Sequence, residues 1–429
     1  MIEKIKIKNF LSFKDEVVFS FEASKDSFAE GSQVVKINED VRLLRFAVVY
    51  GYNASGKSNL LKAFEFLRYF WNHKPNSIED SIGVVPFKLD GASPQEHSFF
   101  ELVFWVKGTK YKYQLELDSV QVYSEKLFCY NTSRPLLVFE RMLEGDLSVI
   151  RFGPSLKIDE MILRSVSVNC LKNTSLFVAR KQVNAVIPLL DDVGNWIKLH
   201  LMQGILPVTN LTRYAQKKCE ENVGLTDWLL EFLHQADFNI TGISTNAIEE
   251  PLSDEVMEFL SPLPPQIQER INRGEPLTMR RLRTLFEHTV ENAHQIERYS
   301  LSVEEGGREE ESRGTMRTFG LESALYTAIK GDSFLTIDEI ETSLHPKLLE
   351  KMLFEYLRAE SESQLIVTTH NDGLLDLVGD LLRKDSVWFT EKDGAGVTDL
   401  YKLTDFRGVN RLSSIREAYR NKRFGATMR

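Results

Sequence analysis

The feature that most constrains this chain is a G-x-x-x-x-G-K-S phosphate-binding loop at residues 51 to 58. An apolar run at residues 46 to 50 precedes the loop, and a helical pattern follows it. Apolar side chains recur in that pattern at spacings of three and four, namely Leu60, Phe64, Leu67 and Trp71. Strand, glycine-rich loop and helix are the setting that this motif requires. The sequence therefore predicts a nucleoside triphosphate with Mg²⁺ as the ligand.

The residue types in the loop explain how it would hold phosphate. Glycines let backbone N–H groups converge on phosphate oxygens, and the start of the following helix adds partial positive charge. Lys57 is expected to reach the β- and γ-phosphates, and the Ser58 hydroxyl is expected to ligate Mg²⁺. The expected nucleotide contacts in this segment are Gly51, Asn53, Ala54, Ser55, Gly56, Lys57, Ser58 and Asn59.

Two carboxylates follow a second apolar strand pattern at residues 334 to 337. A carboxylate at the end of such a strand can hold the Mg²⁺ water shell, and Asp338 fits that role. Glu339 would then polarise the attacking water. An acidic pair at a strand end is also a common surface feature. With Lys57 upstream, however, the two motifs complete one metal site.

A histidine, His370, ends a further strand pattern at residues 365 to 370. A lone histidine is often structural or exposed. The carboxyl end of a buried strand nevertheless faces the ligand side of an α/β sheet, so His370 is expected to sense the γ-phosphate. The expected catalytic residues are therefore Lys57, Glu339 and His370.

Ser312 and Gly314 stand just before another amphipathic helical pattern. Serine and glycine at a helix start can bind an anion, although both are also ordinary capping residues.

The organisation of the 429-residue chain suggests an α/β protein interrupted by an insertion. Residues 1–154 would form the N-terminal half of a nucleotide-binding head with a β meander, and residues 301–429 the C-terminal half. Residues 155–300 read as a largely helical insertion with few strands. A net charge of −9 argues against a uniformly basic nucleic-acid coat, but leaves room for a local basic patch.

The sequence predicts a cytoplasmic protein without a membrane segment. Its three widely spaced cysteines match no zinc motif and suit a reducing compartment. The first residues carry no secretory pattern, and no apolar run approaches the length of a membrane span.

The order of these motifs resembles the ABC/SMC-like ATPases, and more closely the bacterial AAA-type ATPases related to the OLD and RecF groups. The segments that carry the resemblance are residues 5–13, 51–58, 311–315, 337–346, 364–370 and 419–426. The resemblance implies an ABC-type P-loop ATPase head, a mixed β-sheet flanked by helices, that binds and hydrolyses ATP with Mg²⁺.

The resemblance also implies a homodimer or higher homo-oligomer with ATP at the interface. Ser312 and Gly314 would then contact the γ-phosphate held by another copy, and residues 343–345 would join the sites across the interface. The signature departs from the usual L-S-G-G-Q. Gln95 and Gln114 are the candidates for the glutamine that links the insertion to the metal.

OLD proteins carry a TOPRIM nuclease domain after the ATPase, whereas only 59 residues follow His370 here. Any effector, a toxin or a TOPRIM-like nuclease, is therefore expected to be a separate protein. By analogy, the chain resembles the ATPase subunit of two-component phage-defence systems such as PARIS and abortive-infection systems.

Three alternatives stay open at this point. One is a RecF/SMC-like DNA repair or maintenance ATPase stimulated by DNA, and another is a scaffold that binds ATP without hydrolysing it. A GTPase is disfavoured because residues 421–424 lack the aspartate of a guanine-reading N-K-x-D motif. The third alternative to be decided concerns the basic tail from Arg407 to Arg429. The tail would either bind phosphate, nucleic acid or an acidic partner, or be neutralised by acidic residues of its own assembly.

Overall fold

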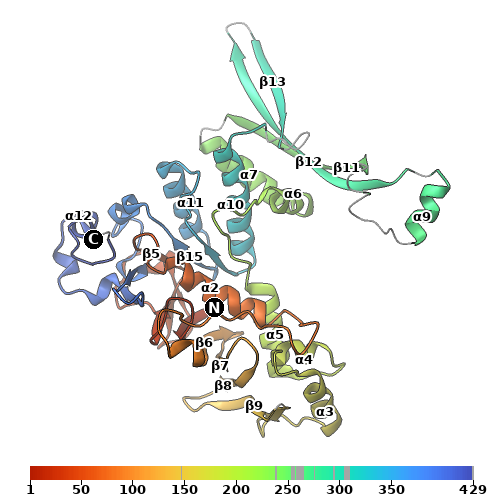
Figure 1. Ribbon diagram of the computed structural model, residues 1–429. Helices are drawn as coiled ribbons and strands as arrows, with labels where there is room; N and C mark the ends of the chain where they lie inside the picture. Colours follow the sequence, from red (N-terminus) through yellow and green to blue (C-terminus); the bar gives the residue numbers. More distant parts are fainter. Residues whose placement is uncertain are drawn as a thin grey trace. The chain divides into compact units, whose positions relative to one another are not determined.

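The computed structural model describes residues 1–145, 147–236, 239–252, 257, 265–274, 276–292, 295–303 and 310–427 (Figure 1). The chain divides into two compact units. Unit 1 comprises Met1–Pro207, Thr327–Thr342 and Leu349–Arg429, and unit 2 comprises Val208–Tyr326 and Ser343–Leu348. Within the described part of the chain, no helix combines the length and the apolar character needed to cross a membrane.

Unit 1 contains a seven-stranded antiparallel sheet with the order β10-β9-β8-β7-β6-β1-β2. Its strands are β1 (Ile2–Lys8), β2 (Val17–Ser20), β6 (Ser98–Val106), β7 (Thr109–Leu117), β8 (Val122–Tyr130), β9 (Leu136–Glu144) and β10 (Leu147–Phe152). Strands β6 to β10 follow one another along the chain, so the expected β meander is present and extends further than the sequence indicated. Buried and less buried side chains alternate along β7, as expected of a sheet with one face in the core.

The second large sheet of unit 1 is mixed, with the order β14-β15-β5-β16-β17. Its strands are β5 (Phe46–Tyr50), β14 (Phe334–Ile337), β15 (Gln364–Thr368), β16 (Val387–Lys392) and β17 (Thr398–Lys402). The first four in space pair in parallel, and β17 is antiparallel to β16. Every residue of β5, β14 and β15 is buried, which explains why the sequence shows them as continuous apolar runs.

Helix α2 (Lys57–Phe70) contacts both of these sheets through its apolar face. The ring centroid of Phe64 lies 4.8 Å from that of Phe334 on β14, and that of Phe66 lies 5.0 Å from that of Phe100 on β6. The helix that follows the phosphate loop is thus fixed by the main core of unit 1.

The remaining elements of unit 1 are short strands and helices around these sheets. They are the hairpin β3 (Val34–Lys36) and β4 (Arg42–Leu44), helices α1 (Glu30–Gln33), α3 (Glu160–Asn169), α4 (Leu176–Lys181), α5 (Pro188–His200) and α12 (Ile415–Arg420), and 3₁₀ turns η1 (Ser93–Gln95), η2 (Asp372–Leu377), η3 (Lys384–Ser386), η4 (Leu403–Asp405) and η5 (Val409–Arg411). Helix α11 (Pro346–Arg358) belongs to unit 1 from Leu349 onward.

Unit 2 combines helices with a three-stranded antiparallel sheet, β11-β12-β13. Its elements are α6 (Thr212–Glu221), α7 (Val223–Gln235), β11 (Ile240–Pro251), α9 (Pro265–Asn272), β12 (Thr278–Asn292), β13 (Gln295–Ser302) and the first part of α10 (Arg313–Lys330). A small core that includes Leu229, Phe286 and Phe319 holds α7, β12 and α10 together.

This sheet departs from the expectation of few strands in residues 155–300. In β12, Thr284 and Phe286 are buried while Arg280 and Arg283 are exposed. The charged residues hide the two-residue period of such a strand, because an isolated three-stranded sheet buries only a few positions. Unit 2 also starts only at Val208, so that α3 to α5 lie within unit 1.

Candidate functional site

The phosphate loop joins β5 to α2, as the sequence predicted. Neighbouring atoms leave no room for a side chain at two of its glycines. A Cβ on Gly51 would lie 2.4 Å from Ser55 Oγ, and a Cβ on Gly56 would lie 2.5 Å from Thr398 Oγ1. Gly56 also has a φ of 111°, which a residue with a side chain adopts only with strain. The loop backbone is therefore shaped as the motif demands.

A buried set of hydroxyl groups supports the loop from behind. Ser55 Oγ and Thr390 Oγ1 are 2.7 Å apart, and Thr398 Oγ1 donates to the Ser55 carbonyl at 2.9 Å. Thr398 Oγ1 also lies 2.8 Å from Ser12 Oγ, which accepts from Asn59 Nδ2 at 2.7 Å. Sequence reasoning missed Ser12, Thr390 and Thr398, because they are separated from the loop by tens to hundreds of residues.

Lys57 is only 5% exposed, and its ammonium group is held inside the loop. Nζ donates to the carbonyl oxygens of Gly51 at 2.9 Å and Tyr52 at 3.2 Å, and lies 3.5 Å from His370 Nδ1. Burial lowers the pKa of the Lys57 ammonium, while the carboxylates of Asp338, Glu339 and Glu341 act in the opposite direction. A cation that is shielded from water in this way is well suited to bind a polyanionic ligand.

Asp338 follows directly after β14 and is 6% exposed. Its Oδ1 accepts hydrogen bonds from Ser58 Oγ at 3.0 Å and from Thr368 Oγ1 at 2.5 Å. Carboxylate and hydroxyl oxygens are the ligands that Mg²⁺ takes from proteins, usually one or two of them with waters completing the shell. The pairing of Ser58 with Asp338 therefore fits a magnesium site.

Glu339 and His370 lie next to each other at the solvent-facing side of this cluster. Glu339 Oε1 is 3.6 Å from His370 Nε2, and the two side chains are 41% and 34% exposed. The backbone N–H of Glu339 donates to Thr368 Oγ1 at 2.8 Å, and its φ is 47°. A positive φ at a residue other than glycine costs free energy, so the surrounding hydrogen bonds must hold Glu339 in this conformation. Glu339 is therefore held in place through its backbone, and its carboxylate is accessible to water.

The residues that the sequence assigned to phosphate, metal and water therefore meet within unit 1. They come from the carboxyl ends of the neighbouring strands β5, β14 and β15. Thr368, at the end of β15, contacts both Asp338 and Glu339 and was not singled out by the sequence. A threonine at a buried strand end carries no signal of its own, because threonine is common in strands.

Ser312 and Gly314 lie at the start of α10 in unit 2. Ser312 Oγ accepts from the Thr315 backbone N–H at 3.1 Å, which is the geometry of a helix cap. A Cβ on Gly314 would lie 3.3 Å from the carbonyl oxygen of Ser343. The start of α10 thus adjoins the segment at 343–345 that was expected to run along a subunit interface.

Neither glutamine suggested by the sequence lies on the strand that carries the metal ligand. Gln95 belongs to η1, and Gln114 on β7 donates from Nε2 to Glu101 Oε2 at 2.7 Å.

The segment 201–205, after α5, runs along the edge of β14. The backbone N–H of Met202 donates to the Phe334 carbonyl at 3.0 Å, and that of Asp338 donates to the Ile205 carbonyl at 2.8 Å. Gln203 lies within this segment and is exposed, and the assignment of Gln95 or Gln114 to the metal stays a prediction.

Comparison with known proteins gives one family match and several structural likenesses. A family model described as "AAA domain, putative AbiEii toxin, Type IV TA system" matches residues 46–153 and 248–376, which together exceed half of the 429-residue chain. The matched stretches contain the phosphate loop, Asp338, Glu339 and His370. No curated protein sequence matches the chain.

Among solved structures, the SMC head domain from Thermotoga maritima is 14% identical, with a TM-score of 0.42 and coverage of 94% of this chain and 98% of that one. The SmcHead bound to the C-winged helix domain of ScpA is 13% identical, with a TM-score of 0.43 and coverage of 94% and 99%.

Proposed function

The chain belongs to the AAA domain family described as putative AbiEii toxin of a Type IV TA system, and on this basis we propose that it is a Mg²⁺-dependent ATPase that switches an oligomeric assembly. One observation carries the proposal. Three segments far apart in sequence, which carry Lys57 and Ser58, Asp338 and Glu339, and His370, are connected by contacts of 3.6 Å or less, in part through Thr368. Such a set supplies a phosphate contact, a metal-binding pair and a base for water.

Each residue has a distinct task in this scheme. Lys57 binds the phosphate oxygens, and Ser58 with Asp338 holds Mg²⁺, which when bound neutralises charge on those oxygens. Glu339 accepts a proton from the attacking water. The ring of His370 lies between Lys57 and Glu339. His370 would therefore sense the γ-phosphate bound by Lys57 and hold the Glu339 carboxylate in position.

We further propose that ATP assembles a homodimer or a higher homo-oligomer. The serine and glycine at the start of α10, Ser312 and Gly314, would contact the γ-phosphate bound by another copy. The packing of this helix start against Ser343 supports the proposal, because both segments would then lie at one interface. A closed form with ATP and an open form after hydrolysis would differ in the surface offered to a partner.

The partner that we propose is a separate effector, a toxin or a TOPRIM-like nuclease, in anti-phage defence. The family description, which names a putative AbiEii toxin of a Type IV TA system, supports a role in defence, whereas the separate effector rests on the resemblance to two-component systems. A RecF/SMC-like DNA maintenance ATPase is the alternative, and it requires that DNA stimulates hydrolysis. A scaffold that binds ATP without turnover is the other alternative.

The test of the ATPase is Glu339→Gln, with Glu350→Gln on the exposed side of α11 as its matched control. Loss of the base should lower turnover by about 10²-fold or more, because general base catalysis contributes on this scale. ATP affinity should stay within about twofold, since the phosphate contacts remain. Light scattering should find the oligomer trapped in the presence of ATP. Unchanged turnover in Glu339→Gln would remove Glu339 from the mechanism.

A further inference from the structure

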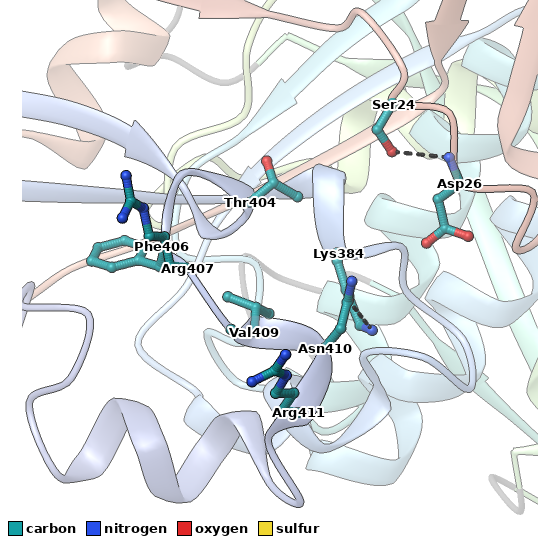
Figure 2. A pocket seen from close by; sticks show the side chains of 10 residues that line it. Ser24, Asp26, Lys384, Thr404, Phe406, Arg407, Val409, Asn410 and Arg411 are labelled. Carbon is teal, nitrogen blue, oxygen red and sulfur yellow. Dashed lines mark hydrogen bonds between the residues drawn. The ribbon is translucent and has the colours of Figure 1, made fainter.

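We propose that a basic pocket in unit 1, away from the phosphate loop, binds the phosphate group of a nucleotide or a polynucleotide (Figure 2). The pocket has a volume of about 970 Å³, and its polar lining includes Ser24, Lys384, Thr404, Arg407, Asn410 and Arg411. It shares no residue with the site around Lys57, so the inference goes beyond the proposed ATPase and does not rest on it.

The pocket is built on a buried ion pair rather than on loose surface loops. Arg383 and Asp385 are 0% and 2% exposed, and Arg383 donates to the two Asp385 oxygens at 2.9 and 2.8 Å. Asp385 Oδ2 also accepts from the backbone N–H and the hydroxyl of Ser24, at 2.7 and 2.6 Å. Because these two residues flank Lys384, the backbone that carries its ammonium group is fixed at the pocket.

The pocket presents mainly hydrogen-bond donors. Lys384 Nζ donates to Asn410 Oδ1 at 2.8 Å, which leaves the amide hydrogens of Asn410 for another acceptor. Arg407 and Arg411 are exposed, and among the residues that the structure describes neither guanidinium has an ion-pair or hydrogen-bond partner. The described lining residues include one carboxylate, Asp26, whose Oδ1 accepts from the Phe28 backbone N–H.

The basic tail identified in the sequence therefore separates into two parts. Arg416 and Arg420, on α12, are neutralised by carboxylates of η2: Arg416 lies 2.6 Å from Asp376, and Arg420 lies 2.5 Å from Asp372. Arg407 and Arg411, by contrast, keep their charge for an external ligand. Ion pairs within the protein thus account for the basic residues of α12, but they do not account for the two arginines of the pocket.

A phosphate ester fits this combination of size, charge and donors. Pockets for small ligands have volumes of roughly 300–1,000 Å³. Guanidinium groups form paired, charge-assisted hydrogen bonds with phosphate oxygens, and amide and hydroxyl donors add further contacts. A smaller hollow of about 280 Å³ shares Lys384 and Val409 with the pocket, but it is also lined by the carboxylate of Asp376. Although the whole chain carries a net charge of −9, the local positive charge of Lys384, Arg407 and Arg411 attracts anions to this pocket.

The experiment compares the wild-type chain with Arg407→Ala/Arg411→Ala. The probe is a fluorescein-labelled single-stranded DNA oligonucleotide read by fluorescence anisotropy, with AMP as a competitor. The double variant should bind the probe at least about tenfold more weakly, because each phosphate interaction of an arginine adds to the affinity. The slope of log affinity against log salt should fall by about 0.7 for each phosphate that the variant no longer neutralises.

Two further variants separate charge from folding. Arg407→Gln/Arg411→Gln keeps side-chain length and polarity and must show the same loss of affinity. Arg134→Ala, an exposed arginine in the loop between β8 and β9, must bind as the wild type does. ATP turnover should be unchanged in all of these variants.

The outcomes distinguish the two sources of phosphate. Displacement of the probe by AMP supports a free nucleotide as the ligand, and probe binding that AMP does not displace supports a polynucleotide. Equal binding by the wild type and the double variant, or no binding of either probe or AMP, would overturn the proposal. An acidic protein that binds the pocket when neither phosphate compound does would also overturn it.

Discussion

The nucleotide end of unit 1 and the start of α10 in unit 2 both carry residues expected to contact ATP, but they are built differently. In unit 1, Lys57 and Asp338 are buried and joined to neighbouring groups by several hydrogen bonds. At the start of α10, Ser312 makes the contacts of an ordinary helix cap. The groups proposed to bind phosphate in the first region are held in place by hydrogen bonds within one chain, whereas Ser312 would contact ATP only across an interface between copies.

The largest effect should come from Lys57→Ala, which removes the buried cation of the first region. ATP affinity should fall by about 10²-fold or more, because charge-assisted hydrogen bonds to phosphate disappear and the loop keeps no comparable cation. Calorimetric titration with ATP measures this change. Lys62→Ala, at an exposed position on the same helix, is the control and should bind normally. Retained affinity in Lys57→Ala would mean that the preformed loop is not where ATP binds.

Removal of Mg²⁺ tests the oxygen ligands of the first region. Chelation by EDTA should lower turnover by about 10²-fold or more, since a bound metal supplies several kcal/mol of charge stabilisation. Addition of Mg²⁺ in excess should restore turnover in the wild type but not in Asp338→Asn. Turnover that survives chelation would argue against Ser58 and Asp338 as a metal pair.

A moderate effect is expected from Thr368→Val, which keeps the shape of the side chain but removes its hydroxyl. The variant lacks both the bond to Asp338 and the acceptor for the Glu339 backbone N–H. We expect kcat to fall by about tenfold, the equivalent of about 1.4 kcal/mol, with little change in ATP affinity. Thr368→Ser should recover most of this activity. A proportional fall in ATP affinity would instead indicate general damage to the site.

The smallest effect on the isolated chain is expected from Ser312→Ala. Removal of the cap should reduce the free energy of unfolding by about 1 kcal/mol, measured by chemical denaturation, and ATP affinity at low protein concentration should not change. Turnover should fall only at protein concentrations at which the oligomer forms. A decrease in turnover that does not depend on protein concentration would place the role of Ser312 within one chain.

The same two regions show what the sequence could and could not predict. The loop from Gly51 to Ser58, together with Asp338, Glu339 and His370, was predictable because each motif encodes its own backbone geometry. The supporting groups Ser12, Thr390 and Thr398 were not, since their roles arise from sheet pairing over long sequence distances.

The prediction for the insertion was less complete for a related reason. Its helices have apolar stripes that the sequence displays, as in α7, where Leu225, Leu229 and Phe232 are buried. The strands β11 to β13 bury few side chains, so their alternation is weak in the sequence. The position of segment 201–205 beside β14 was likewise not predictable, because it depends on the pairing of that segment with the strand.

The most direct test of a site shared between two copies is ATP turnover in a mixture of two inactive variants, Lys57→Ala and Ser312→Arg. A mixed dimer would contain one intact combination, Lys57 of the second variant with Ser312 of the first. We predict that turnover appears on mixing and approaches about one quarter of the wild-type rate, since about half of the dimers would be mixed and each would carry one working site. Turnover equal to the average of the two separate variants would contradict a shared site.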